Sequence, residues 1–138
     1  MKLCDEVITV FNAHWSEELG DEAYCPTVIR GASWHATQAE TVDPKGGLIA
    51  ADRVIVRIPV YANTSGKAYV DVVAYRDAAD VSGLWTLTGG TIIVRGEAEG
   101  DTWTPAELRK RFADCVTVLG VTDNRRAPNG RHWKAVGA

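Results

Sequence analysis

Alternating apolar and polar residues occur in short runs along most of the chain, a pattern typical of half-buried β-strands. In the clearest run, residues 53–61, Val54, Val56, Ile58 and Val60 share one face. The predicted strands are residues 7–11, 27–36, 53–61, 69–75, 84–87, 91–96 and 116–121. Turn residues separate these runs at intervals of about ten residues, so the sequence predicts six or seven short strands.

One helix is predicted, over about residues 104–113. Thr104 is a candidate N-cap, Pro105 occupies the first helical position, and Glu107 completes a capping box. Leu108 and Phe112 then lie four residues apart on one apolar face. Strands and helix together predict a mainly β fold, a small antiparallel β-barrel or sandwich with one short α-helix.

At 138 residues the chain fits one domain with a core of its own. No apolar stretch approaches the roughly 20 residues that cross a bilayer. The N-terminus turns acidic at Asp5 and Glu6 before a signal peptide could form. We therefore expect a protein with no membrane partner that stays in the cytoplasm where it is made. Its net charge of −3 argues against a general affinity for nucleic acid.

Charge is divided unevenly along the chain. Residues 1–123 hold 11 of the 15 Lys and Arg residues and all 18 Asp and Glu residues, a net charge of −7, whereas residues 124–138 carry +4. We therefore predict a domain of residues 1–123 and an extended C-terminal arm of residues 124–138 that attaches to the acidic body of a second copy. The residues predicted to form this subunit interface are Arg125, Arg126, Arg131, Trp133 and Lys134, with Trp133 as the docking anchor. A frayed, solvated terminus is the alternative.

Catalysis and metal binding require residue combinations whose spacing this sequence does not offer. The three histidines stand apart, and Cys4, Cys25 and Cys115 lack the two-residue spacing of zinc and redox sites. We therefore predict reduced thiols, no metal, no cofactor and no enzymatic activity. Most of the five tryptophans are expected in the core, with one or two at an interface.

Several segments spread over nearly the whole chain carry a resemblance to a known family. They are residues 2–4, 8–13, 26–29, 31–34, 57–60, 90–96, 119–129 and 132–134. In these segments the sequence resembles small, functionally uncharacterised proteins encoded among the head-tail joining genes of tailed bacteriophages and prophages of Gram-positive bacteria.

The resemblance implies a structural β-barrel subunit that forms a homo-oligomeric ring, of sixfold or twelvefold symmetry, in the virion neck. A head-closure ring of this kind would join the portal and adaptor proteins to the tail proteins and retain packaged double-stranded DNA. Two loops, residues 43–47 and 63–67, are long enough to project from a barrel and are the candidates to line its channel, through Asp43 and Lys45 and through Asn63 and Lys67.

Two other functions are compatible with the same residues. Tail completion or tail termination is the nearest alternative to head closure. An alternative of another class is a small monomeric β module that binds a glycan, a peptide or single-stranded nucleic acid through Trp and Arg side chains.

Overall fold

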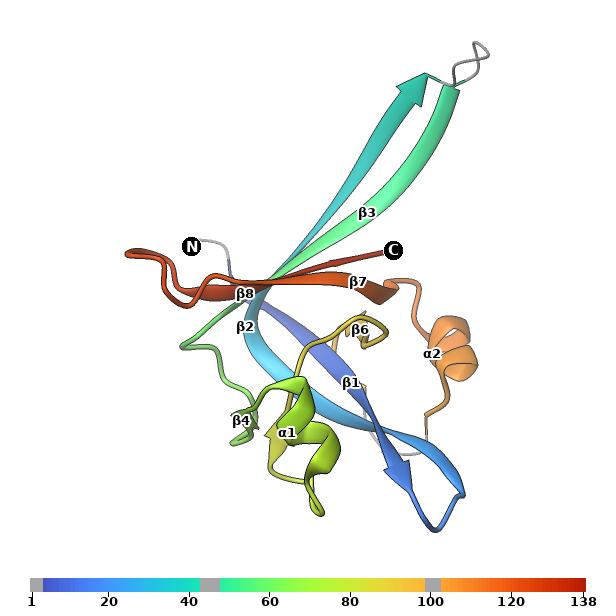
Figure 1. Cartoon of the computed structure of the whole chain (residues 1–138). Helices are drawn as coiled ribbons and strands as arrows, with labels where there is room; N and C mark the ends of the chain where they lie inside the picture. The colour runs from blue at the N-terminus through green and yellow to red at the C-terminus, as the bar shows by residue number, and fades with distance from the viewer. Residues whose placement is uncertain (1–3, 43–47, 99–102) are drawn as a thin grey trace.

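The computed structural model describes residues 4–42, 48–98 and 103–138 and contains a closed barrel of six antiparallel strands (Figure 1). The prediction of a mainly β, antiparallel fold is confirmed, and a barrel is the form that the chain adopts. In order around the barrel the strands are β1 (Glu6–Ser16), β2 (Asp21–Val42), β3 (Leu48–Pro59), β8 (His132–Gly137), β7 (Cys115–Asp123) and β6 (Ile92–Arg95), which pairs with β1 again.

All six strands contribute side chains to the barrel interior. The buried residues of this core are Ile8, Val10, Ile29, Ala32, Val56, Ile58, Trp85, Leu87, Ile93, Val116, Val118, Trp133 and Ala135. A second, smaller cluster lies beneath α2 (Pro105–Arg111), where Leu108 packs with Phe11, Ile92 and Val94. Residues 8–11 of β1 and 92–94 of β6 are therefore buried on both faces, which explains why these stretches are mostly apolar rather than alternating.

The predicted helix is confirmed as α2, and Thr104 is its N-cap as predicted. The hydroxyl Oγ1 of Thr104 accepts a hydrogen bond from the backbone N–H of Glu107 at 3.2 Å, and it donates one to the Glu107 carboxylate at 3.1 Å. One otherwise unpaired backbone N–H at the helix start is thereby satisfied, while the Glu107 carboxylate binds the Thr104 hydroxyl and not the backbone N–H of a complete capping box. No helix in the described part of the chain is long and apolar enough to cross a membrane.

The predicted strand 69–75 is wrong over most of its length. Only Tyr69 lies in a strand, the two-residue β4 (Ala68–Tyr69), which pairs in parallel with β5 (Leu84–Trp85). The chain then forms a second helix, α1 (Val72–Asp77), because a carboxylate oxygen of Asp71 accepts a hydrogen bond from the N–H of Ala74 at 2.9 Å. This local cap outweighs the strand propensity of the valines.

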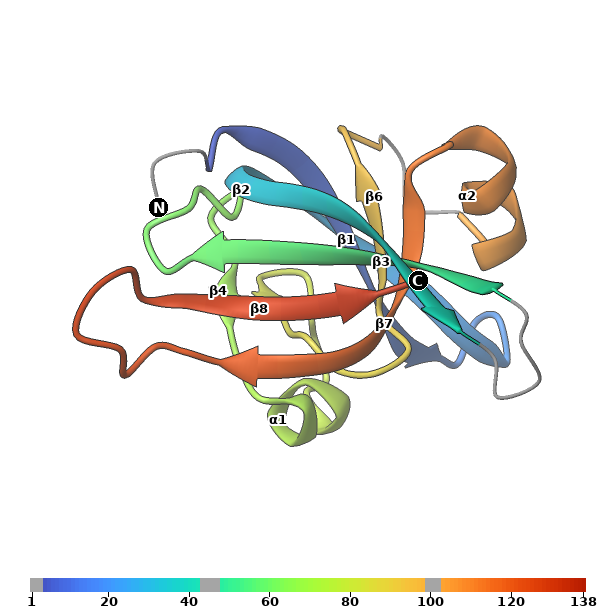
Figure 2. The same cartoon turned by 90° about the horizontal axis from the view of Figure 1, so that it is seen from above.

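The prediction of a free C-terminal arm is wrong, because residues 132–137 form the barrel strand β8. This strand lies between β3 and β7 and pairs with both, as Figure 2 shows. Its residues are alternately half-buried and buried, with Trp133, Ala135 and Gly137 facing inward. Residues 124–131 form the turn that leads into β8, so residues 124–138 complete the barrel of residues 1–123 and do not form a free arm.

A different segment projects from the barrel. β2 and β3 continue past their last barrel neighbours, which they meet at the pairs Glu6–Ala32 and Val54–Gly137. Beyond these points, within the described part of the chain, they pair only with each other, from Thr37–Arg53 to Val42–Leu48. Figure 1 shows this two-stranded β2–β3 ribbon, residues 37–42 and 48–53, extending away from the barrel.

Gly137 tests the closure of the barrel by β8. A Cβ atom at this position would lie 2.9 Å from Val116 Cγ2 and 3.0 Å from the carbonyl oxygen of Thr117. We expect Gly137→Ala to lower the free energy of unfolding by about 1–3 kcal/mol, because the tightly packed β7–β8 contact must open. Chemical denaturation measures the change.

Gly120 in β7 provides the matched control. A Cβ atom there would meet nothing within 4 Å, so Gly120→Ala should change the stability by less than about 0.5 kcal/mol. Equal denaturation midpoints for the two variants would show that β8 does not pack against β7 as described.

Candidate interaction surfaces

Arg125, predicted to bind a second copy, is fixed by contacts within its own chain. Its guanidinium lies 5.0 Å from the ring centroid of Tyr69 and 5.4 Å from that of Trp133. It also donates hydrogen bonds to both carboxylate oxygens of Asp123, from Nε to Oδ1 at 3.0 Å and from Nη2 to Oδ2 at 2.7 Å. This bidentate pair holds the pKa of Asp123 below its usual range. Arg125 therefore orders the β7–β8 turn.

Trp133 is a core residue, so its predicted role as a docking anchor is wrong. Only 6% of its surface is exposed, and its ring packs at 5.2 Å from that of Trp85 and at 4.6 Å from that of Tyr69. Lys134 follows it in β8 as a half-buried residue paired with Arg57 of β3. Trp133 faces the core, and Lys134 is held in a strand that is paired on both sides, so neither residue belongs to a free arm.

Arg126 and Arg131 are the predicted interface residues that remain available. Both are exposed, and neither forms an ion pair with a described residue; Nε of Arg131 donates to the carbonyl of Ala127 at 3.4 Å. Beside them lie Val60 and Tyr61, 44% and 70% exposed, since the N–H of Val60 donates to the carbonyl of Arg131 at 3.1 Å. We call these four residues the basic end.

The β1–β2 turn lies at the other end of the barrel in both views (Figures 1 and 2). It carries four exposed acidic residues, Glu17, Glu18, Asp21 and Glu22. Trp15 and Leu19 beside them are 60% and 69% exposed.

A groove of 540 Å³ separates the β1–β2 turn from the start of α2. We call it the acidic groove, and its lining includes Leu19, Asp21, Glu22, Tyr24, Trp103 and Pro105. The sequence shows the acidic turn as an exposed segment but gives no sign of the groove, because Trp103 and Pro105 are about 80 residues further along the chain.

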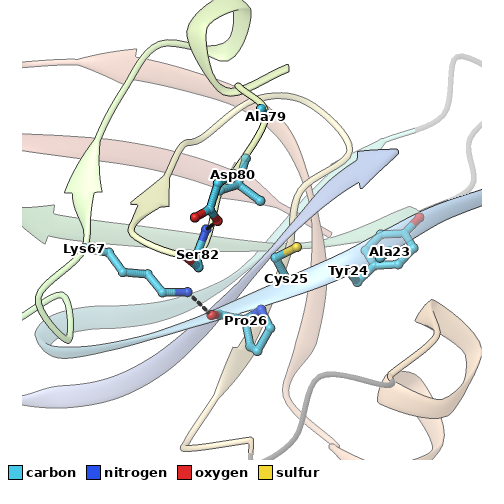
Figure 3. Close-up of a pocket in the computed structure, with 9 residues that line it drawn as sticks. Ala23, Tyr24, Cys25, Pro26, Lys67, Ala79, Asp80 and Ser82 are labelled. Atoms are coloured by element: carbon cyan, nitrogen blue, oxygen red, sulfur yellow. Dashed lines mark hydrogen bonds between the residues drawn. The ribbon is translucent and has the colours of Figure 1, made fainter. Parts of the chain in front are cut away.

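Of the two loops predicted to line a channel, the structure describes only residues 63–67. Asp43 and Lys45 lie outside the described residues. Asn63 and Lys67 belong to a turn that packs on β2: the N–H of Asn63 donates to the carbonyl of Arg30 at 2.9 Å. Lys67 Nζ donates to the carbonyl of Pro26 at 2.5 Å, as Figure 3 shows. This turn is held against the barrel, and its role in lining a channel stays a prediction.

Lys67 also lines a pocket of 500 Å³ with Cys25, Asp80 and Ser82 (Figure 3). Burial lowers the pKa of the Lys67 amine. A carboxylate oxygen of Asp80 accepts a hydrogen bond from the N–H of Ser82 at 2.9 Å. Lys67 and Asp80, the two charged side chains that line the pocket, are thus bonded to backbone groups of their own chain. Among the described residues, no group of three or more His, Cys, Asp or Glu could hold a metal ion.

The chain matches a known family over nearly its whole length. The family is described as "Family of unknown function (DUF6751)", and the match covers residues 3–138. It includes every strand of the barrel and both helices. No curated protein and no solved structure matches the chain.

The contact between Arg125 and Asp123 predicts that the pKa of Asp123 depends on Arg125. In Arg125→Ala the Asp123 carboxylate loses its hydrogen bonds to the guanidinium, so its pKa should rise toward the ordinary value. Because the folded-state pKa is depressed, the stabilisation by this pair is present above the unfolded-state pKa and is lost as the pH falls through the folded-state value. An NMR pH titration of the Asp123 carboxyl carbon measures the shift.

Arg126→Ala is the control for this titration. It removes an equal charge from the same turn, but Arg126 makes the smallest contribution to the lowered pKa of Asp123. The Asp123 pKa should therefore change little. If the two variants shift it equally, the depressed pKa reflects the general charge of the turn and not the bidentate pair.

Proposed function

We propose that this protein, which belongs to the Family of unknown function (DUF6751), is a structural subunit of a bacteriophage head-tail connector. It would assemble as a head-closure ring in the virion neck, joining the portal and adaptor proteins to the tail and retaining packaged DNA. The observation that carries the proposal is the β2–β3 ribbon.

The ribbon has the form of an assembly element. Six residue pairs of β2 and β3, from Thr37–Arg53 to Val42–Leu48, have no third strand beside them among the residues that the structure describes. An isolated two-stranded ribbon is marginally stable in water and exposes unpaired backbone groups along both edges. Contact with a neighbouring subunit or a partner protein would satisfy these groups. A closed barrel that extends such a ribbon is therefore suited to joining larger bodies.

The distribution of charge also supports an assembling protein. The barrel presents acidic residues at the β1–β2 turn and Arg126 and Arg131 at the opposite end. Surfaces of opposite sign on one subunit favour head-to-tail contacts, which close into rings when the rotation between copies closes. The net negative charge is compatible with DNA passing through such a ring, because few cations would hold its phosphates.

The phage setting of the proposal comes from the sequence resemblance to head-tail joining proteins. Tail completion or tail termination is compatible with the same assembly features. The monomeric binding module has less support, because two of its candidate stacking residues, Trp85 and Trp133, are buried in the core.

Antibody labelling of phage particles tests the proposed location. Particles released by cells that encode the protein should carry label at the junction of head and tail. A second set of particles would contain a variant in which an Asn-Gly turn replaces residues 38–52, joining the paired residues Thr37 and Arg53. We expect this variant to fold and the particles to separate into heads and tails, because the ribbon is missing.

Circular dichroism of the purified ribbon variant is the control that its barrel is intact. Label at the tail tip, or particles without the protein, would contradict the proposed function. Intact particles assembled from the ribbon variant would instead show that the ribbon does not join the two bodies.

A further inference from the structure

The acidic groove and the adjoining β1–β2 turn carry four carboxylates, of which Asp21 and Glu22 line the groove itself. Glu17, Glu18, Asp21 and Glu22 form no ion pair with any residue that the structure describes. One carboxylate oxygen of Asp21 accepts a hydrogen bond from the neighbouring N–H of Glu22 at 2.7 Å, which leaves most of its acceptor capacity free. Four unpaired negative charges at one turn repel one another and favour a cationic partner.

The groove also supplies apolar and aromatic surface. Leu19, Tyr24 and Trp103 line it beside Asp21 and Glu22. An arginine side chain suits this combination, because its flat guanidinium stacks on aromatic rings while its N–H groups bind carboxylates. The same combination of contacts occurs within the chain, where Arg125 stacks on Tyr69 and Trp133 and binds Asp123.

We propose that the basic end of a second copy occupies the acidic groove, with Arg126 and Arg131 paired to Asp21 and Glu22. This contact rests on the proposed function, for which it supplies the interface between neighbouring subunits. Arg125 does not take part, because Asp123 already binds its guanidinium.

The chain cannot fill its own groove. The β7–β8 turn and the β1–β2 turn lie at opposite ends of the barrel in both views (Figures 1 and 2). Contact between these ends therefore requires two molecules, and it leaves one free groove and one free basic end on the pair. Such a heterologous contact propagates from copy to copy, as a ring requires.

Exposed apolar residues accompany the charges at both ends. Trp15 and Leu19 lie at the acidic turn and are 60% and 69% exposed, and Tyr61 at the basic end is 70% exposed. Large exposed aromatic side chains are typical anchors of protein interfaces. Burial of these residues would add affinity to the charge pairing, which by itself is weak in water.

Charge reversal tests the contact directly. One variant carries Asp21→Lys with Glu22→Lys, a second carries Arg126→Glu with Arg131→Glu, and a third combines all four. The third variant has the net charge of the wild type, −3, so any difference in self-association between the two reflects where the charges lie and not their sum. The control is Lys110→Glu with Arg111→Glu, exposed residues in the last turn of α2 that do not line the groove.

Sedimentation velocity over a range of protein and salt concentrations measures self-association. We expect the wild type and the control to associate more weakly as salt increases. Each two-residue reversal at the ends should weaken association at least about tenfold. The combined variant, and an equimolar mixture of the first two variants, should restore it.

Three results would overturn the proposal. They are a wild type that stays monomeric at low salt, reversals that associate as well as the wild type, and a combined variant that is not restored. If only the Asp21 and Glu22 reversal weakens association, a basic segment of the second copy other than Arg126 and Arg131 occupies the groove, and the proposed pairing is wrong. Particle labelling decides the proposed function independently, so a connector that assembles through another surface remains distinguishable from a protein that is not a connector.

Discussion

The insertion of β8 between β3 and β7 is the interaction on which the rest of the structure depends. It closes the sheet, so that no barrel strand is left with an unpaired edge along the barrel wall. It also brings Trp133 into the core beside Trp85. Since β8 is fixed, the charged residues before it must form a turn at one end of the barrel, and this turn becomes the basic end.

Closure also explains why the ribbon is the projecting part of the molecule. β8 pairs with β3 only as far as Val54, and β1 pairs with β2 only as far as Ala32. The remaining lengths of β2 and β3 have no barrel neighbour and must continue outward as a pair. The molecule thus has a rigid closed body, two ends of opposite charge and one extended ribbon, three features suited to a subunit that joins other proteins.

Local signals in the sequence predicted part of this structure. The capping box at Thr104 located α2, and the apolar runs located most barrel strands, because short-range hydrogen bonding and burial determine both. The prediction of an arm is wrong because the charges around Trp133 indicate an exposed segment, whereas the inward positions of β8 alternate through Trp133, Ala135 and Gly137. Pairing with β3, some 75 residues away, decides their burial. The acidic groove could not be predicted for the same reason, since its two walls meet only in the folded chain.

Hydrogen exchange of the β8 amides tests barrel closure most directly. A strand that completes the barrel should exchange its paired amides only through global unfolding, as slowly as the buried amides of β1. If the amides of residues 132–137 exchange rapidly while those of β1 remain protected, the C-terminal segment is a detachable arm and the closed barrel described above is contradicted.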